Sequence, residues 1–172
     1  MRGNEGLVAL CVLAGSLLFL GARAWDDQGR FNPARTPLPA QFETGADGGR
    51  LLRLDAGPGG HFFFEGQANG SDIRFMVDTG ASVTTLTESD AARAGLSVGP
   101  RDFNRPFETA NGTLMAATGR LAELRIGEAV LYDLEVAIAP DEALGGSLFG
   151  MNGLNRFDRR EATRDELILR MD

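Results

Sequence analysis

Short apolar runs, separated by glycine and asparagine turn signals, fill the chain from Leu51 onward. Runs of this length and spacing are typical of strands joined by hairpins. No long amphipathic helix pattern competes with them. At 172 residues the chain has room for one globular unit. The pattern therefore predicts one all-β domain over residues 51–172, following a segment of different character.

The first predicted hairpin places an acidic residue at the end of a strand. Residues 61–67 and 73–77 flank the dipeptide Asn69-Gly70. This dipeptide favours the positive φ angles of a tight hairpin turn. The second strand of the hairpin therefore ends at Asp78.

Capping signals predict one short helix after this hairpin. Thr87 followed by Asp90 is typical of a helix N-terminus, and Gly95 is typical of a helix end. We therefore expect a helix over residues 88–94.

A second hairpin is predicted around Asn111-Gly112, with residues 106–110 and 113–117 as its strands. Its small polar tip indicates a mobile surface finger.

Two longer strands are predicted about Gly127-Glu128 in the segment 121–139. Alternation along the second strand predicts one core-facing set of side chains. The members of this set are Val130, Tyr132, Leu134, Val136 and Ile138. After them, residues 151–157 predict a helical turn and residues 166–170 a final strand.

The composition excludes several kinds of catalytic site. All seventeen basic residues are arginine, which excludes lysine-based Schiff-base and P-loop chemistry. The single Cys11 and single His61 exclude Ser-His-Asp, Cys-His and clustered zinc sites within one chain. We expect His61 to be a surface or turn residue. A net charge of -7 without a basic stripe argues against nucleic acid as a partner.

The segment Asp78-Thr79-Gly80-Ala81-Ser82 carries the strongest chemical signal. It places a carboxylate at the end of an apolar strand. Burial disfavours an ionised carboxylate unless it has hydrogen-bond donors or a partner that shares its proton. Gly80 leaves its backbone N–H unobstructed, and the hydroxyls of Thr79 and Ser82 can orient the carboxylate.

Residues 60–170 resemble the retropepsin-like aspartic proteases, particularly their exported, single-lobe bacterial branch. Three blocks carry the resemblance: residues 60–82 with the Asp-Thr-Gly turn, residues 109–117, and residues 147–157. The resemblance implies a pepsin-like barrel of one lobe, with one or two short helices.

The resemblance also implies roles for individual residues. Asp78 matches the catalytic position, supported by Thr79, Gly80 and Ser82. The Asn111-Gly112 hairpin matches the flap that covers substrate. The three residues that pack beneath the catalytic loop are Leu148, Phe149 and Gly150.

The mechanism of this family uses two carboxylates about one water, whereas this chain has one such aspartate. The resemblance therefore implies a homodimer that hydrolyses peptide bonds of a protein substrate, without a cofactor or metal. A non-catalytic pepsin-like binding or dimerisation module at the membrane is the alternative interpretation.

The start of the chain belongs in a membrane or a translocon, because Gly6–Ala22 carries no charge. Residues 1–24 form either a transmembrane anchor or a signal peptide, since Ala22-Arg23-Ala24 resembles a cleavage site. Arg23, directly behind the apolar run, favours the anchor. Residues 25–50 are expected to be a linker. We expect a single-pass inner-membrane protein with a periplasmic protease domain, or a soluble periplasmic protein after cleavage.

Overall fold

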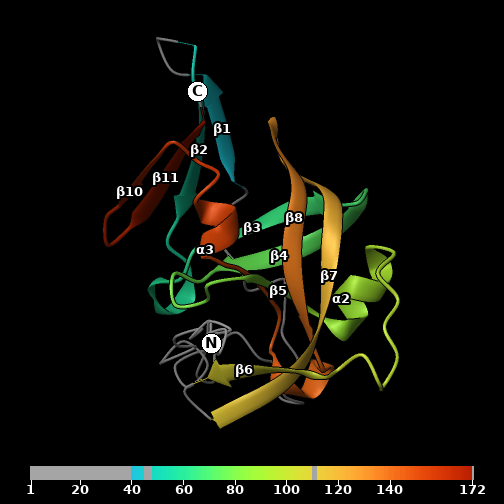
Figure 1. The fold of residues 1–172 in the computed structure, drawn as a ribbon. Coiled ribbons are helices and arrows are strands. Elements are labelled where there is room, and N and C mark those ends of the chain that lie inside the picture. Colours follow the sequence, from blue (N-terminus) through green and yellow to red (C-terminus); the bar gives the residue numbers. More distant parts are fainter. Residues whose placement is uncertain (1–39, 45–47, 110–111, 172) are drawn as a thin grey trace, which may run out of the picture.

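The computed structural model describes residues 40–44, 48–109 and 112–171. Over these residues the chain is mostly strand, with two short α-helices, which confirms the predicted all-β class (Figure 1). None of the helices in these three ranges is both long and apolar enough to span a membrane. The expected N-terminal helix over 1–24 lies outside the described residues.

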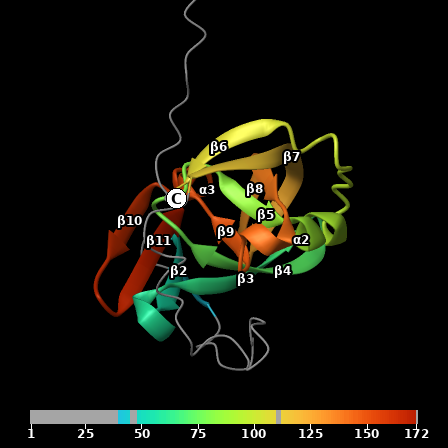
Figure 2. The ribbon, with the colours of Figure 1, turned by 90° about the horizontal axis from the view of Figure 1, so that it is seen from below.

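A seven-stranded sheet forms the barrel and has the order β3-β4-β9-β5-β8-β7-β6. A further pairing of β3 with β7, at Gln67 opposite Arg125, closes the sheet on itself. Figure 2 shows β9 between β4 and β5. The strands are β3 Phe63–Ala68, β4 Ser71–Val77, β5 Thr84–Thr87, β6 Arg105–Thr109, β7 Gly112–Ile126, β8 Ala129–Ala139 and β9 Ser147–Phe149.

The hairpin of β3 and β4 forms as its turn residues predict. Asn69 and Gly70 both have positive φ, 49° and 84°. Along β4 the side chains of Ile73, Phe75 and Val77 are buried in the main core. The alternation of the strand therefore turns the residues between them toward the outer face of this sheet.

A second, four-stranded sheet has the order β1-β2-β11-β10 and lies beside the barrel, opposite the β6–β7 hairpin (Figure 1). Its strands are β1 Gln41–Thr44, β2 Arg50–Asp55, β10 Arg159–Ala162 and β11 Glu166–Met171. β1 lies inside the segment expected to be a linker. Its side chains and those of β10 are exposed, so neither strand has the apolar alternation that reveals a strand in sequence.

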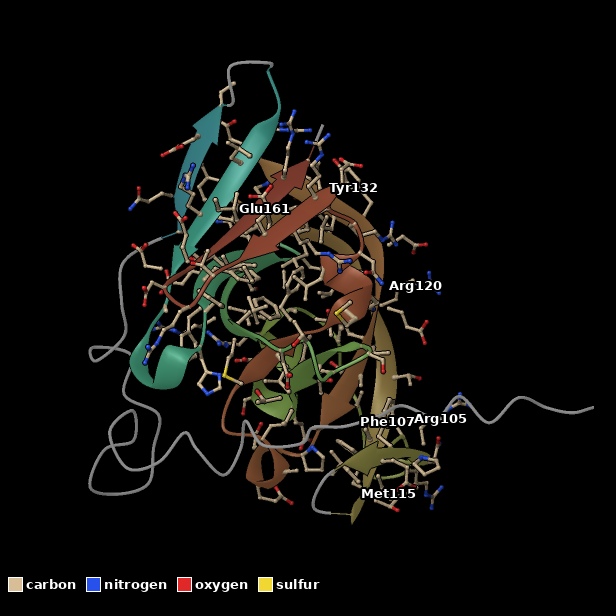
Figure 3. All side chains as sticks on the ribbon, turned by 90° about the vertical axis from the view of Figure 1, so that its left-hand side faces the viewer. Arg105, Phe107, Met115, Arg120, Tyr132 and Glu161 are labelled. Carbon is tan, nitrogen blue, oxygen red and sulfur yellow. The ribbon has the colours of Figure 1, made fainter. Side chains whose placement is uncertain are left out.

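The predicted core face of β8 is partly wrong. Leu134, Val136 and Ile138 are buried as expected, but Tyr132 is 61% exposed and Leu131 is buried instead. Asp133 has a φ of 57°, and this kink reverses the inside–outside phase of the strand. Figure 3 shows Tyr132 among the outward-pointing side chains.

Two short α-helices flank the barrel, and both predicted helices are confirmed over shorter spans. α2, Glu88–Arg93, begins where the Thr87 side chain accepts a hydrogen bond from the Asp90 amide at 3.2 Å. α3, Met151–Leu154, follows β9. Short 3-10 turns, η2 Pro58–Gly60 and η3 Asp141–Ala143, precede β3 and β9.

The side chains form a large core and a smaller apolar cluster. The large core contains four aromatic rings, Phe64, Phe75, Phe149 and Phe157, whose neighbouring centroids are 5.1–6.5 Å apart. Edge-to-face and stacked contacts at these distances stabilise aromatic pairs. The smaller group, here called the outer cluster, comprises Phe63, Met76, Ala139, Leu144 and Leu148.

Candidate active site

Asp78 follows directly on β4, at the point where this strand runs parallel to β9. Val77 pairs with Phe149 across the two strands, and the Asp78 amide donates to the Phe149 carbonyl at 3.0 Å. Because Phe149 is fully buried among the core aromatics, the backbone that carries Asp78 is tied to a rigid part of the molecule.

The carboxyl group of Asp78 is buried, with the residue only 5% exposed. One oxygen, Oδ1, accepts a hydrogen bond from the Gly80 amide at 2.8 Å. The other, Oδ2, is buried and has no hydrogen-bond partner among the described residues. Burial raises the pKa of this carboxyl above its ordinary value of 3.8, opposed by the Gly80 and Ala81 amides and by the positive field of His61. The group is thus suited to hold a proton.

The loop that follows Asp78 rests on the start of α3. The Met151 amide donates to the Ala81 carbonyl at 2.7 Å, and the Asn152 amide donates to the Ser82 carbonyl at 3.0 Å. These two donors lie at the N-terminus of a helix, where backbone amides lack partners within the helix. The loop therefore takes its shape from contacts with a distant segment.

Gly150 lets the two segments approach this closely. A Cβ on this residue would lie 2.6 Å from the Val83 carbonyl carbon and oxygen and 2.8 Å from the Ala81 oxygen. Real side chains do not tolerate such distances from backbone atoms, so only glycine fits here. The expectation that Leu148, Phe149 and Gly150 pack beneath the loop agrees with these contacts for Phe149 and Gly150, whereas Leu148 lies in the outer cluster.

Thr84 and Asn152 anchor the loop, and neither was anticipated from sequence. The Asn152 Oδ1 atom accepts from the Thr84 amide at 2.7 Å and from the Thr84 hydroxyl at 2.9 Å. The same hydroxyl oxygen accepts from the Gly150 amide at 3.2 Å. Thr84 is fully buried, so these bonds lie away from water. The feature that could have indicated Thr84 is a polar residue in a strand, β5, whose side chains are mostly buried.

The remaining predicted site residues lie around this loop or at the hairpin. Thr79 is exposed at the turn, and Gly80 and Ser82 are half-buried. Gly112 begins β7 with a φ of 109°, whereas Asn111 lies outside the described residues.

The β6–β7 hairpin presents apolar side chains near the barrel's open end. Met115 is 44% exposed and Phe107 is half-buried. Figure 3 shows both gathered with Arg105 on this hairpin. Leu114, from the same hairpin, packs against the outer cluster. The hairpin thus contacts the sheet face that also carries Asp78.

A pocket of about 700 Å³ opens over this outer face. Apolar side chains of the outer cluster form one part of its wall, and a polar part faces α2. The lining includes Phe63, Met76, Leu144 and Leu148, together with Arg74, Asp90, Arg93 and Asp141. Met76 precedes Asp78 by two residues, so strand alternation places both side chains on the outer face. The pocket wall therefore begins at the residue next to Asp78 on that face.

Hydrogen bonds to the start of α2 hold the polar side of the pocket. The Ser147 hydroxyl donates to Asp90 Oδ2 at 2.5 Å and accepts from the Thr87 amide at 3.2 Å. Asp141 accepts from both the amide and the hydroxyl of Ser89, which lowers the pKa of Asp141. These bonds fix α2 against the loop that precedes β9.

Among the described residues, no group of three or more His, Cys, Asp or Glu side chains is placed to hold a metal ion.

The comparisons with known proteins agree with this geometry. A family model, gag-polyprotein putative aspartyl protease, matches residues 64–156, more than half of the chain. A crystal structure of a retropepsin-like aspartic protease from Rickettsia conorii matches with a TM-score of 0.64 and 32% identity, covering 76% of this chain and 95% of that one.

Two curated relatives also match. An uncharacterized protein in the cobV 5' region of Sinorhizobium sp. is 34% identical over 134 residues, 78% of this chain. An uncharacterized protein of Rickettsia prowazekii (strain Madrid E) is 37% identical over 135 residues, 77% of this chain. The aligned parts span 58% and 56% of these relatives' lengths. With its Asp-Thr-Gly turn at the end of a buried strand and the fold described above, the chain belongs to the retropepsin-like aspartic proteases.

Proposed function

We propose that this protein is an aspartic endopeptidase in which Asp78 is the catalytic carboxylate. The observation that carries the proposal is the state of the Asp78 carboxyl: buried, held through Oδ1 by the Gly80 amide, and without a partner for Oδ2 among the described residues. A buried acceptor without a partner destabilises the folded protein. Such groups are therefore rare, and they occur most often at functional sites. A bound water, or a second carboxyl that shares a proton, would satisfy Oδ2.

The second carboxyl comes from another copy of the chain. The Asp-Thr-Gly segment occurs once in the sequence, so two carboxyls meet only when two copies pair about a two-fold axis. Two carboxyls at close range share one proton, because both cannot ionise readily. The ionised member takes a proton from the water as it attacks the peptide carbonyl carbon, and the protonated member donates to the carbonyl oxygen. No covalent enzyme intermediate forms.

The pocket over the outer face receives an apolar side chain of the substrate. Met76 lies beside Leu148 in the register of β4 with β9, and both line the pocket. Burying a large aliphatic or aromatic side chain against such a wall is worth about 1.5–3 kcal/mol. The β6–β7 hairpin would cover the peptide from the other side.

We also propose that the protease domain lies on the periplasmic side of the inner membrane. The proposal rests on the uncharged run Gly6–Ala22, which is retained as an anchor or removed as a signal. Its substrates would then be exported or membrane-associated proteins.

Digestion of a peptide library tests the catalytic proposal. The full-length chain in mild detergent should cleave peptides next to apolar residues, and Asp78→Ala should remove those cleavages. Asp165→Ala is a control, because Asp165 is an exposed carboxylate that does not line the pocket. Identical products from the wild-type chain and Asp78→Ala would instead favour a non-catalytic binding module.

Sedimentation across a range of protein concentrations tests the pairing. Activity should rise with the fraction of dimer, because each monomer supplies one carboxyl. A strictly monomeric species with full activity would contradict a site shared by two copies.

A further inference from the structure

His61 lies beside Asp78 at the end of the β3–β4 ladder. The register pairs Phe63 with Met76, and the Val77 amide donates to the Phe62 carbonyl at 2.9 Å. The pairing therefore continues beyond β3, and one further step places His61 opposite Asp78. Directly opposed residues in an antiparallel pair have Cβ atoms about 4.5–5.5 Å apart.

Side-chain directions put the two groups on the same face. Phe62 packs against the main core, whereas Phe63 and Met76 belong to the outer cluster. Alternation then turns His61 to the outer face, where it makes an edge contact with Phe63 at 6.5 Å between ring centroids. His61 is half-buried and ends the η2 turn, where its carbonyl accepts from the Gly57 amide at 2.7 Å, which agrees with the expectation of a surface or turn residue.

We propose, on the basis of the protease function proposed above, that His61 is a positioning residue for the Asp78 carboxyl. Its imidazole faces the carboxyl across the ladder and, when protonated, stabilises the ionised form. The base of the reaction is then available at lower pH than an isolated buried aspartate would allow. The positive field of His61 indeed opposes the increase in the Asp78 pKa that burial causes.

Other charged groups lie farther along this face. Arg74 sits over the Phe63 ring at 5.6 Å and pairs across the strands with Glu65, so the Phe63–Met76 rung separates it from His61. The preceding turn, residues 56–60, has no charged side chain. Asp165 reaches this turn through its backbone carbonyl, which accepts from the Ala56 amide. Asp78 is therefore the charged group that lies opposite His61 on this face.

Removal of the imidazole charge is the direct test. His61→Gln should move the acid limb of the kcat/KM profile to higher pH by at least about half a unit, the size expected for a charge about 5 Å away in bulk water, and by more where the site excludes water. His61→Arg keeps a positive charge and should retain the wild-type limb. Arg101→Gln removes an exposed charge that lies outside the β3–β4 ladder and is the control.

A second readout does not need catalysis. The carboxyl carbon resonance that disappears in Asp78→Asn reports the titration of Asp78 by NMR. Its midpoint should rise in His61→Gln and stay at the wild-type value in His61→Arg. Equal midpoints in all three proteins would overturn the role of His61, even if the protease function holds. A shifted midpoint in a chain that cleaves no peptide would instead retain the His61–Asp78 coupling and reject the protease function.

Discussion

Replacing Asp78 with asparagine should change how stability depends on pH. The Asp78 carboxyl is buried, and its Oδ2 has no partner among the described residues. Leaving a buried polar atom unpaired destabilises a folded protein by about 1–3 kcal/mol, and more when the group is charged. The wild-type chain bears this penalty in full only where the carboxyl is ionised.

The direction follows from the raised pKa of Asp78. The folded protein holds this proton more tightly than the unfolded chain, whose carboxyl titrates near 3.8. The contribution of the group to the free energy of unfolding is therefore largest below pH 3.8, and it is lost as pH rises through the folded-state pKa. Asparagine does not titrate. The variant should therefore gain about 1–3 kcal/mol relative to wild type between pH 3 and pH 7.

Urea unfolding measures this gain. The full-length wild-type and Asp78→Asn chains would be unfolded at pH 3 and pH 7, at one protein concentration in the same detergent, and followed by circular dichroism. Any penalty from burying an unpaired amide N–H in the variant is the same at both pH values and cancels in the difference. Asp165→Asn is the matched control, because Asp165 is an exposed carboxylate. A gain at pH 7 no larger than at pH 3 would refute the reasoning.

Three further substitutions test the parts that hold the loop and the pocket. Gly150→Ala places a Cβ 2.6 Å from the Val83 carbonyl and should lower the free energy of unfolding in urea by about 1–3 kcal/mol or more, whereas Gly146→Ala should not. Thr84→Val keeps the volume but removes the buried hydroxyl, so unfolding should become easier by about 1–3 kcal/mol and cleavage should slow; unchanged values for both would remove Thr84 as an anchor. Leu148→Ala enlarges the apolar wall of the pocket and should shift cleavage in a peptide library toward larger side chains, which an unchanged preference would contradict.

Local signals predicted much of the fold. The turn at Asn69-Gly70 and the helix cap at Thr87 each depend on residues within four positions of one another, so both can be predicted directly from the sequence. The inside–outside alternation of the β8 side chains could not be predicted in the same way. The positive φ of Asp133 interrupts the alternation, and nothing in the neighbouring residue types distinguishes this position from an ordinary exposed one.

The candidate site was predictable only where its residues are contiguous. Asp78 and Gly80 belong to one local turn, and this turn follows the strand after which the sequence predicts it. Thr84 and Asn152 are 68 residues apart, so their hydrogen bonds depend on the antiparallel pairing of β5 with β9, in which Thr85 lies opposite Leu148. The relation of His61 to Asp78 could not be predicted for the same reason, because it arises from strand register beyond the regular ladder.

The burial of Asp78 affects both the stability of the fold and the chemistry of its carboxyl group. Burial raises the pKa of Asp78 and makes the ionised form of its carboxyl a source of instability. The same raised pKa suits a carboxyl that must hold a proton and then release it to a peptide. The loop keeps this arrangement because Gly150 and the Thr84 hydroxyl bind it to buried backbone, which prevents the carboxyl from turning toward water. If Asp78→Asn is the more stable protein at pH 7 and cleaves nothing, stability and catalysis will have been traced to the same buried oxygen.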